Sequence, residues 1–252
     1  MRYVLWITLL LWLAASLPAW AQIGPPQPRA RRHGYSLGVG VHNVRSRWMP
    51  YDYDVARNRI YIEGSFAFTD CVEAFGRAGV SDWVVNDVES YEPGLTRDVS
   101  SDGYPAFLSG GVRGKAWQFG RVSVGGSIEA AWHAAFEKHV RWDYDVYQEL
   151  LFDSTVEITA ALSVGCNLGR SVLYGGPLVH FGYNRVDVRT HEFGDDWDVE
   201  ESVDALTIRD KGGCGGFLGW RAPIGRNGWH LQLEGAGLTG GCAGALGFFR
   251  SW

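Results

Sequence analysis

Long apolar runs are missing from the sequence after residue 21. A transmembrane helix needs about 20 consecutive apolar residues, so the rest of the chain predicts no helical membrane span. Hydrophobic residues at the 3.6-residue spacing of a helix are also scarce. The cysteines lack the close pairs of a zinc site; they are Cys71, Cys166, Cys214 and Cys242. Export from the cytoplasm would permit disulfides, but the spacing assigns no pairing, and buried free thiols are an equal alternative.

The first 21 residues have the three-part order of a secretory signal peptide. Arg2 is followed by an apolar stretch over residues 4–15, and Ala19-Trp20-Ala21 ends the segment. The alternative is a membrane anchor, for which the apolar stretch is short. We therefore expect cleavage after Ala21. Residues 22–33 are proline-rich and basic, which predicts a flexible lead-in, and residues 34–252 then form one domain.

Glycine and aromatic residues are abundant, with 34 glycines and 14% aromatics in the chain. Both suit short twisted strands. In residues 35–44, Leu37, Val39 and Val41 alternate with small or polar residues, the pattern of a strand between lipid and a filled lumen. The same two-residue period predicts ten strands, over residues 35–44, 58–69, 72–85, 106–118, 122–138, 147–165, 172–189, 203–220, 229–238 and 242–252.

The connections between these strands alternate in length. The long ones span residues 47–57, 86–105, 139–146 and 190–202, and the short ones 69–70, 119–121, 167–171 and 221–228. Only the last connection, 239–241, departs from the alternation. Outer-membrane barrels have long outer loops and short periplasmic turns, and hydrocarbon offers no hydrogen-bond partner to an open sheet edge. The sequence therefore predicts an all-β fold, a closed antiparallel up-and-down transmembrane β-barrel of about ten strands, with eight or twelve as alternatives.

Two further features bear on this barrel. Pro177 falls inside a predicted strand, where proline normally marks a bulge or a strand end. Tryptophans agree with the barrel, because aromatic residues form girdles at both membrane surfaces. We expect Trp48, Trp83, Trp142 and Trp197 at the outer surface and Trp117, Trp220, Trp229 and Trp252 at the inner one. Trp132 lies mid-strand on the predicted apolar face.

Charged residues recur on the polar side of the strands. If the second and third strands turn at Thr69-Asp70, Glu63 lies opposite Arg77, and the same folding brings Glu157 near His180. We interpret the whole set as a structural charge network that fills the lumen, with a catalytic or conducting site as the alternative. The network comprises Glu63, Glu73, Arg77, Arg113, Glu129, Glu157, His180 and Glu234.

Acidic and aromatic residues alternate in three of the outer connections, which suggests that strands extend beyond the membrane. Clustered carboxylates suit calcium, so these connections are one candidate cation site; a solvated acidic surface is the simpler interpretation. The candidate ligands are Asp52, Asp54, Asp143, Asp145, Asp195, Asp196 and Asp198. His191 and Glu192 could serve a barrel enzyme, but no spacing matches a catalytic motif. We therefore expect no catalytic residue, resident metal or cofactor.

The C-terminal strand and one hairpin resemble a known group of proteins. Leu246, Phe248 and Trp252 share one side of the last strand, which resembles the terminal signal that the barrel-insertion machinery reads, although Arg250 departs from it. The hairpin of residues 62–70 and 75–79 resembles hairpins of small bacterial outer-membrane β-barrel proteins, the OmpA/OmpX-like superfamily. The likeness covers the whole barrel and is one of pattern, without a diagnostic motif.

This resemblance implies a monomer in the outer membrane of a Gram-negative bacterium. Its implied partners are membrane lipid, lipopolysaccharide and, through Trp252, the insertion machinery, with no nucleic acid. The implied role is structural or in surface interaction, with a filled polar lumen. A small porin, a barrel enzyme acting on lipid or peptide, and a secreted β-sandwich are the alternatives, because a fold alone does not choose among functions.

Overall fold

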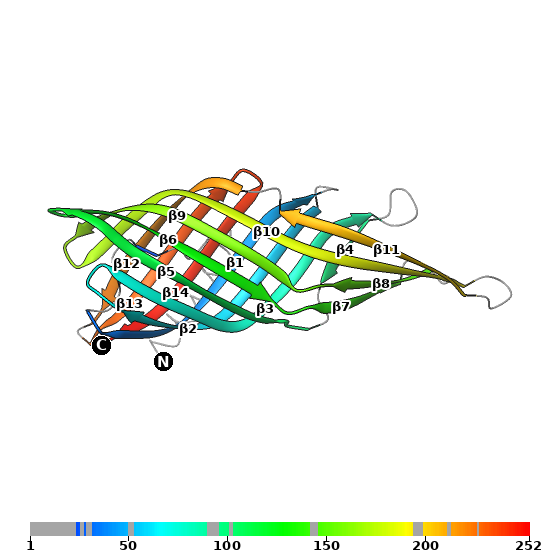
Figure 1. Cartoon of the computed structure of the whole chain (residues 1–252), viewed down its shortest axis with the longest axis horizontal. Helices are drawn as coiled ribbons and strands as arrows, with labels where there is room; N and C mark the ends of the chain where they lie inside the picture. Colours follow the sequence, from blue (N-terminus) through cyan, green and yellow to red (C-terminus); the bar gives the residue numbers. More distant parts are fainter. Residues whose placement is uncertain are drawn as a thin grey trace, which may run out of the picture.

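The computed structural model describes residues 24–25, 28, 32–49, 53–89, 96–100, 103–141, 146–193, 199–210, 213–225 and 227–252. Their strands form one antiparallel sheet of fourteen strands that curls into a tube, with the C-terminus at one end and hairpins projecting from the other (Figure 1). All four cysteines are free thiols. Among the described residues, no helix is long and apolar enough to cross a membrane.

Ten of these strands close a barrel. In order round the ring they are β1 (Tyr35–Met49), β2 (Tyr53–Ala67), β3 (Val72–Glu89), β5 (Ala106–Phe119), β6 (Val122–His133), β9 (Thr155–Leu168), β10 (Ser171–Phe193), β12 (Gly213–Ile224), β13 (Trp229–Leu238) and β14 (Gly241–Ser251). β1 pairs with β14, starting from Ser36 opposite Ser251. β10 pairs with β12, starting from Val172 opposite Arg221. Every strand of the ring thus has two neighbours, and the predicted closed ten-stranded barrel is confirmed.

Four shorter strands extend the barrel at the end away from the C-terminus, which we call the outer end. They are β4 (Thr96–Ser100), β7 (Phe136–Arg141), β8 (Val146–Phe152) and β11 (Val199–Asp210). β4 pairs with β3, β7 with β8, and both β8 and β11 with the outer part of β10. The predicted long connections are therefore largely strand. The predicted strand 122–138 is broken after β6, and the predicted strand 147–165 is broken before β9.

The connections at the inner end, beside the C-terminus, are short, as the sequence predicts. Between β2 and β3, Thr69 Oγ1 accepts backbone hydrogen bonds from Cys71 (3.1 Å) and Val72 (3.0 Å). Between β9 and β10, only Gly169 and Arg170 form the turn, and Gly169 has a φ of +66°. Glycine adopts this left-handed conformation at low cost.

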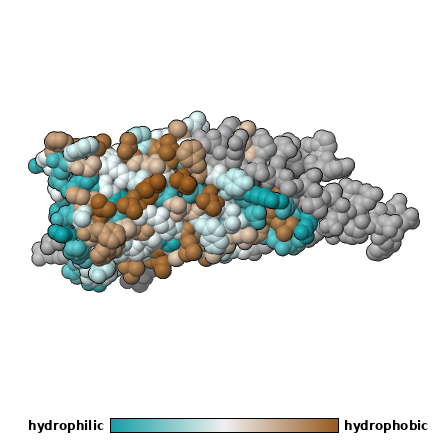
Figure 2. All heavy atoms as spheres, in the orientation of Figure 1, coloured by the Kyte–Doolittle hydropathy of each residue, from teal (hydrophilic) through white to brown (hydrophobic). Residues whose placement is uncertain are grey.

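The barrel wall presents apolar side chains outward and polar or small ones inward. On β1, Tyr35, Leu37 and Val39 are exposed while Ser36 is buried, and Ile60 is exposed on β2. Figure 2 shows apolar residues as brown patches over the wall and hydrophilic residues gathered at the inner end. An exposed apolar band of this kind is expected of a surface that faces lipid.

Two of the predicted girdle tryptophans lie inside the barrel instead. Trp48 and Trp83 are fully buried, with ring centroids 5.9 Å apart. Their assignment to the outer membrane surface is wrong, because Trp48 shares the inward parity of Val44 and Ser46 on β1. Trp142 and Trp197 lie outside the described residues. Exposed tryptophans of the wall and its inner end are Trp117, Trp132, Trp220 and Trp252.

Pro177 lies within β10 without a change of register, as the predicted strand 172–189 requires. It lies opposite Gly216 of β12. On its other side the register with β9 is the same at Gly175, opposite Val164, as at Leu178. A proline has no N–H to donate, and the described ladder with β9 skips residues 176 and 177.

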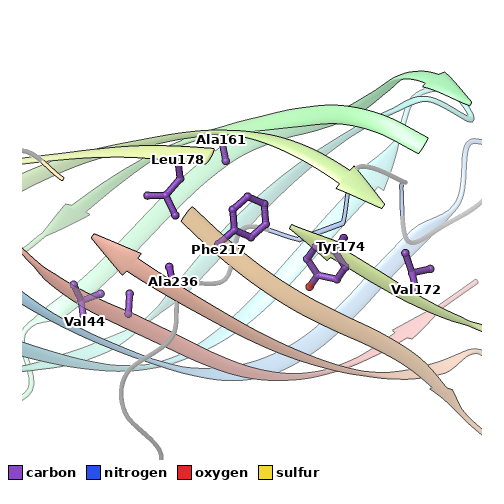
Figure 3. Close-up of a cluster of buried hydrophobic side chains, with 8 residues drawn as sticks. Val44, Ala161, Val172, Tyr174, Leu178, Phe217 and Ala236 are labelled. Atoms are coloured by element: carbon purple, nitrogen blue, oxygen red, sulfur yellow. The ribbon is translucent and has the colours of Figure 1, made fainter. Parts of the chain in front are cut away.

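One part of the lumen is apolar. Side chains from β1, β9, β10, β12, β13 and β14 form this buried cluster, which is drawn in Figure 3. Its members are Val44, Ala161, Val172, Tyr174, Leu178, Phe217, Ala236 and Ala243. The charged residues described next occupy other parts of the same lumen.

Candidate functional site: the lumen charge network

The lumen charges lie at the inward positions of the strands. On β2, Arg57, Arg59 and Glu63 are buried, whereas Ile60 and Ile62 between them are exposed. Successive residues of a strand point to opposite faces, so all inward residues of a strand are an even number of positions apart. Pairing in register then brings the inward charges of neighbouring strands together inside the ring.

Glu63 and Glu73 belong to a series of ion pairs that we call the inner chain. Arg113 of β5 donates from Nη2 to Glu63 Oε1 (2.6 Å) and from Nε to Glu73 Oε2 (3.2 Å). Arg77 of β3 donates from Nε to Glu63 Oε2 (2.8 Å) and from Nη1 to both oxygens of Glu129 (2.7 Å each). The inner chain thus joins side chains of β2, β3, β5 and β6 along one wall.

Glu157 is the centre of a second group, the cross-lumen cluster. Arg57 and Arg59 of β2 both contact its carboxylate, and His133 Nε2 of β6 lies 3.5 Å from Glu157 Oε1. None of these four side chains is more than 4% exposed. In the ring, β2 and β9 are four strands apart, so the two arginines reach across the lumen. The cluster therefore obstructs the middle of the tube.

Aromatic rings pack against the arginines of the cross-lumen cluster. The guanidinium carbon of Arg57 lies 5.3 Å from the ring centroid of Trp48 and 5.2 Å from that of Trp83. The guanidinium carbon of Arg59 lies 4.9 Å from the ring centroid of Phe107. Cation–π contacts of this kind contribute about 2 kcal/mol when desolvated. Charge and aromatic surface together therefore fill this level of the lumen.

Glu234 of β13 forms a third group and is 1% exposed. Gln232 Nε2 donates to Glu234 Oε1 (2.5 Å), and the hydroxyl of Tyr174 donates to the same oxygen. The backbone N–H of Gly24 also donates to this oxygen, at 2.6 Å. Gly24 and Pro25 belong to the segment predicted as a flexible lead-in, and both are buried.

The predicted pairing of Glu63 with Arg77 agrees with the register, in which the two residues lie directly opposite each other. His180 lies opposite Thr159 and forms a 2.8 Å hydrogen bond with its hydroxyl through Nδ1. Glu157 lies one step along the same inward row, opposite Gly182, so it is near His180 without a described hydrogen bond to it.

Sequence reasoning missed Arg57 and Arg59. Residue 57 was assigned to an outer connection, because the second strand was started at residue 58. Arg59 has the same parity as Glu63, and this signal was present in the sequence. The groups around Glu234 were also missed, since Tyr174 and Gln232 carry no charge.

A cavity of about 30 Å³ remains between the inner chain and the cross-lumen cluster. Its polar lining includes His42, Arg59, Glu129, Glu157 and His180. About 10–15 Å³ of space for water centres is enough to hold one water molecule, so the cavity has room for bridging water.

Asp54 is the predicted cation ligand whose side chain the structure describes. It lies 3.7 Å from Arg45 Nε and accepts a hydrogen bond from Asn86 Nδ2 (3.2 Å). The Asp54 carboxylate therefore already contacts an arginine and an amide. The other candidates lie outside the described residues: Asp52, Asp143, Asp145, Asp195, Asp196 and Asp198.

A different group on the β7–β8 hairpin offers possible metal ligands. Ligand atoms of Glu137, His139 and Glu149 lie within 4.8 Å of one another. His139 lies opposite Glu149 in the register, and its Nε2 is 2.8 Å from Glu137 Oε1. Arg189 Nη1 lies 3.5 Å from Glu149 Oε2. The group is largely exposed. The ion pairs just described are enough to explain why its side chains lie close together without a metal.

A closed ring with apolar residues outside and paired charges inside defines a β-barrel of the membrane-spanning class. The chain is similar to the outer-membrane protease OmpT of Escherichia coli, with 8% identity over 92% of this chain and 96% of that one and a TM-score of 0.39. It is also similar to the translocator domain of the autotransporter NalP of Neisseria meningitidis, with 12% identity over 88% and 90% and a TM-score of 0.48.

A third similar structure is the COG4313 outer-membrane channel of Pseudomonas putida F1, with 9% identity over 92% of this chain and 100% of that one and a TM-score of 0.36. At these identities the likeness concerns the fold and carries no activity across. No protein-family model and no curated protein matches the chain.

Proposed function

We propose that this chain is a structural or surface-interaction protein of a Gram-negative outer membrane, with a closed lumen and no enzymatic activity. Membrane location is supported by the exposed apolar band, which is stable against hydrocarbon and costly in water. Its partners are then membrane lipid and lipopolysaccharide, in a role like that of the OmpA/OmpX-like barrels. The surface role is supported by the strands that project beyond the ring at the outer end (Figure 1).

The cross-lumen cluster is the observation that carries the proposal. Arg57 and Arg59 on one wall share Glu157 on the far wall, and all three side chains are buried. A solute crossing this level would have to separate the ion pairs. Removing one partner of a buried pair typically costs about 3–5 kcal/mol because the other charge is left uncompensated, so separating these charges inside the lumen would also be costly.

Single-channel recording of the full-length protein in planar lipid bilayers tests the closed lumen. We expect no stepwise conductance in concentrated KCl, under conditions in which a general porin, as a positive control, gives regular steps. Regular ohmic steps from this protein would contradict the proposal and favour the small-porin alternative.

Cell fractionation and gel migration test the location. The processed protein should fractionate with the outer membrane and should migrate faster on a gel when unheated, because a closed barrel resists unfolding in cold detergent. Recovery in the aqueous periplasmic fraction would contradict the membrane location.

A further inference from the structure

The inner part of the lumen contains a piece of chain that is not part of the barrel wall. Gly24 and Pro25 are buried there, ahead of the start of β1. The chain joins the wall at the inner rim, where His33 N donates to Ala67 O (2.7 Å) and Ala67 N donates to Gly34 O (3.0 Å). Of the described residues before β1, Gly24 and Pro25 therefore lie inside the lumen and His33 and Gly34 lie at its inner rim.

Gly24 lies between opposite walls of the barrel. Its N–H donates to Glu234 of β13, and a Cβ added to it would lie 2.7 Å from Nη1 of Arg113 on β5. In the ring, β13 and β5 are five strands apart, which is the greatest separation that ten strands allow. A backbone within contact of both side chains lies across the lumen axis.

Both contact groups are held in place by other side chains. The Glu234 carboxylate accepts hydrogen bonds from Gln232 and Tyr174. Arg113 is fixed by its ion pairs with Glu63 and Glu73. The acceptor and the guanidinium on either side of Gly24 are therefore positioned by the barrel itself, independently of the segment between them.

The conformation of Gly24 makes the fit specific for glycine. Its φ is +88°, a value that residues with a side chain rarely adopt. An added Cβ would also force Nη1 of Arg113 to shift. The backbone conformation therefore favours glycine here, and the guanidinium held by Glu63 and Glu73 adds to that preference.

We propose that the inner lumen is a binding site for the chain's own N-terminal segment, which acts as a plug anchored at Gly24. The plug contacts Glu234 of β13 and Arg113 of β5, and neither residue belongs to the cross-lumen cluster. This inference goes beyond the proposed function, because it assigns a ligand to the lumen.

Hydrogen–deuterium exchange with mass spectrometry on the full-length protein in detergent micelles tests the plug. We expect the amides of the N-terminal segment to exchange about tenfold more slowly in the wild type than in Gly24→Val, since a hydrogen bond to a charged group has this order of strength. Gly24→Val introduces a side chain at positive φ and against Arg113. Exchange in fragments of β1 and β13 should not change.

Gly169→Val is the matched control. Gly169 also has a positive φ, +66°, but no atom lies within 4 Å of an added Cβ. This variant strains a surface turn and should leave the N-terminal segment protected. Glu234→Ala removes the acceptor and should release the segment as Gly24→Val does.

Two results would overturn the plug: unprotected N-terminal amides in the wild type, or unchanged protection in Gly24→Val. Gly24→Val alters no residue of the barrel wall, so the test stands even if Glu234→Ala fails to fold. A conducting protein with a protected N-terminal segment would refute the closed lumen and the segment's role as a plug, while leaving its binding at Gly24 in place. A non-conducting protein with an unprotected segment would refute the plug alone.

Discussion

Glu157 shows at the residue scale how a lumen charge is tolerated. Its side chain is 2% exposed, and two arginines and a histidine surround the carboxylate. A buried charge is costly unless it is paired, and removal of one charge leaves its partners uncompensated. The contacts of Glu157 therefore matter more for stability than ion pairs at the surface.

Glu157→Gln is expected to lower the free energy of unfolding by about 3–5 kcal/mol, because Arg57 and Arg59 lose their shared counter-charge. Urea unfolding of the protein in lipid vesicles measures the change. The matched control is Glu137→Gln, which breaks an ion pair with His139 in which both side chains are 47% exposed; such pairs contribute about 0–1 kcal/mol. Equal effects of the two changes would contradict this assignment.

Arg250 departs from the apolar residue usual in its slot, and its surroundings supply a reason. Its guanidinium carbon lies 4.9 Å from the ring centroid of Trp252 and 5.7 Å from that of Trp229. We expect Arg250→Ala to destabilise the barrel by about 1–2 kcal/mol through loss of two cation–π contacts, and Arg250→Lys to retain part of this. Thermal unfolding measures the stability of both variants. An unchanged melting temperature for Arg250→Ala would show that the cation–π contacts with Trp229 and Trp252 do not stabilise the barrel.

Local charge pairs could be predicted from the sequence, and distant ones could not. Glu63 and Arg77 lie on strands joined by a tight turn, and in the register both are equally far from Asp70, the centre of that turn. Arg57 and Glu157 are separated by many residues, and their contact depends on the curvature of the closed ring. Strand parity alone cannot supply that curvature.

At the element scale, alternation along β2 assigns each residue to lipid or lumen. Ile60 and Ile62 are more than half exposed, whereas Tyr61 and Glu63 are buried. This alternation was readable from the sequence because both faces have strict requirements: lipid excludes charge, and a narrow lumen excludes unpaired polar groups.

A lysine placed on the lipid face should be costly in proportion to its depth. Ile62→Lys, in the middle of the wall on β2, is expected to destabilise the barrel by about 2–4 kcal/mol. Phe68→Lys, just past the inner end of the same strand and also exposed, should cost about 0–1 kcal/mol. Equilibrium unfolding in vesicles measures both variants, and equal costs would mean that Ile62 does not face hydrocarbon.

The boundaries of the strands were harder to predict from the sequence than the strands themselves. The break between β6 and β7 falls at Ala134 and Ala135, neither of which is a turn residue, so nothing in the sequence marks it. Pro177 is a residue that normally ends a strand, yet the ladder on the β12 side continues past it. In both places tertiary pairing overrides the local residue preference.

At the scale of the whole molecule, ring closure and the outer extension use largely different hydrogen bonds. The ring is completed by pairing of β10 with β12 over residues 172–180 and 213–221. The outer part of β10 pairs instead with β11 and β8, beginning at residues 183 and 186. β11 also pairs with β1, but only through residues 209 and 210, so the part of the β10–β11 hairpin beyond Asp187 and Ala205 should be separable from the barrel.

Replacement of residues 188–204 by Asn-Gly tests this separation. Asp187 and Ala205 lie opposite each other, so a two-residue turn can close the shortened hairpin. We expect the variant to insert, to keep its faster migration when unheated, and to melt only slightly lower than the wild type, since the lost contacts lie outside the ring. A variant with Gly-Gly in place of Gly169-Arg170 at the inner end serves as a control for turn replacement. Loss of heat-modifiable migration in the hairpin variant alone would show that the outer hairpin takes part in closing the barrel, because pairing of residues 172–180 with 213–221 would then be insufficient on its own.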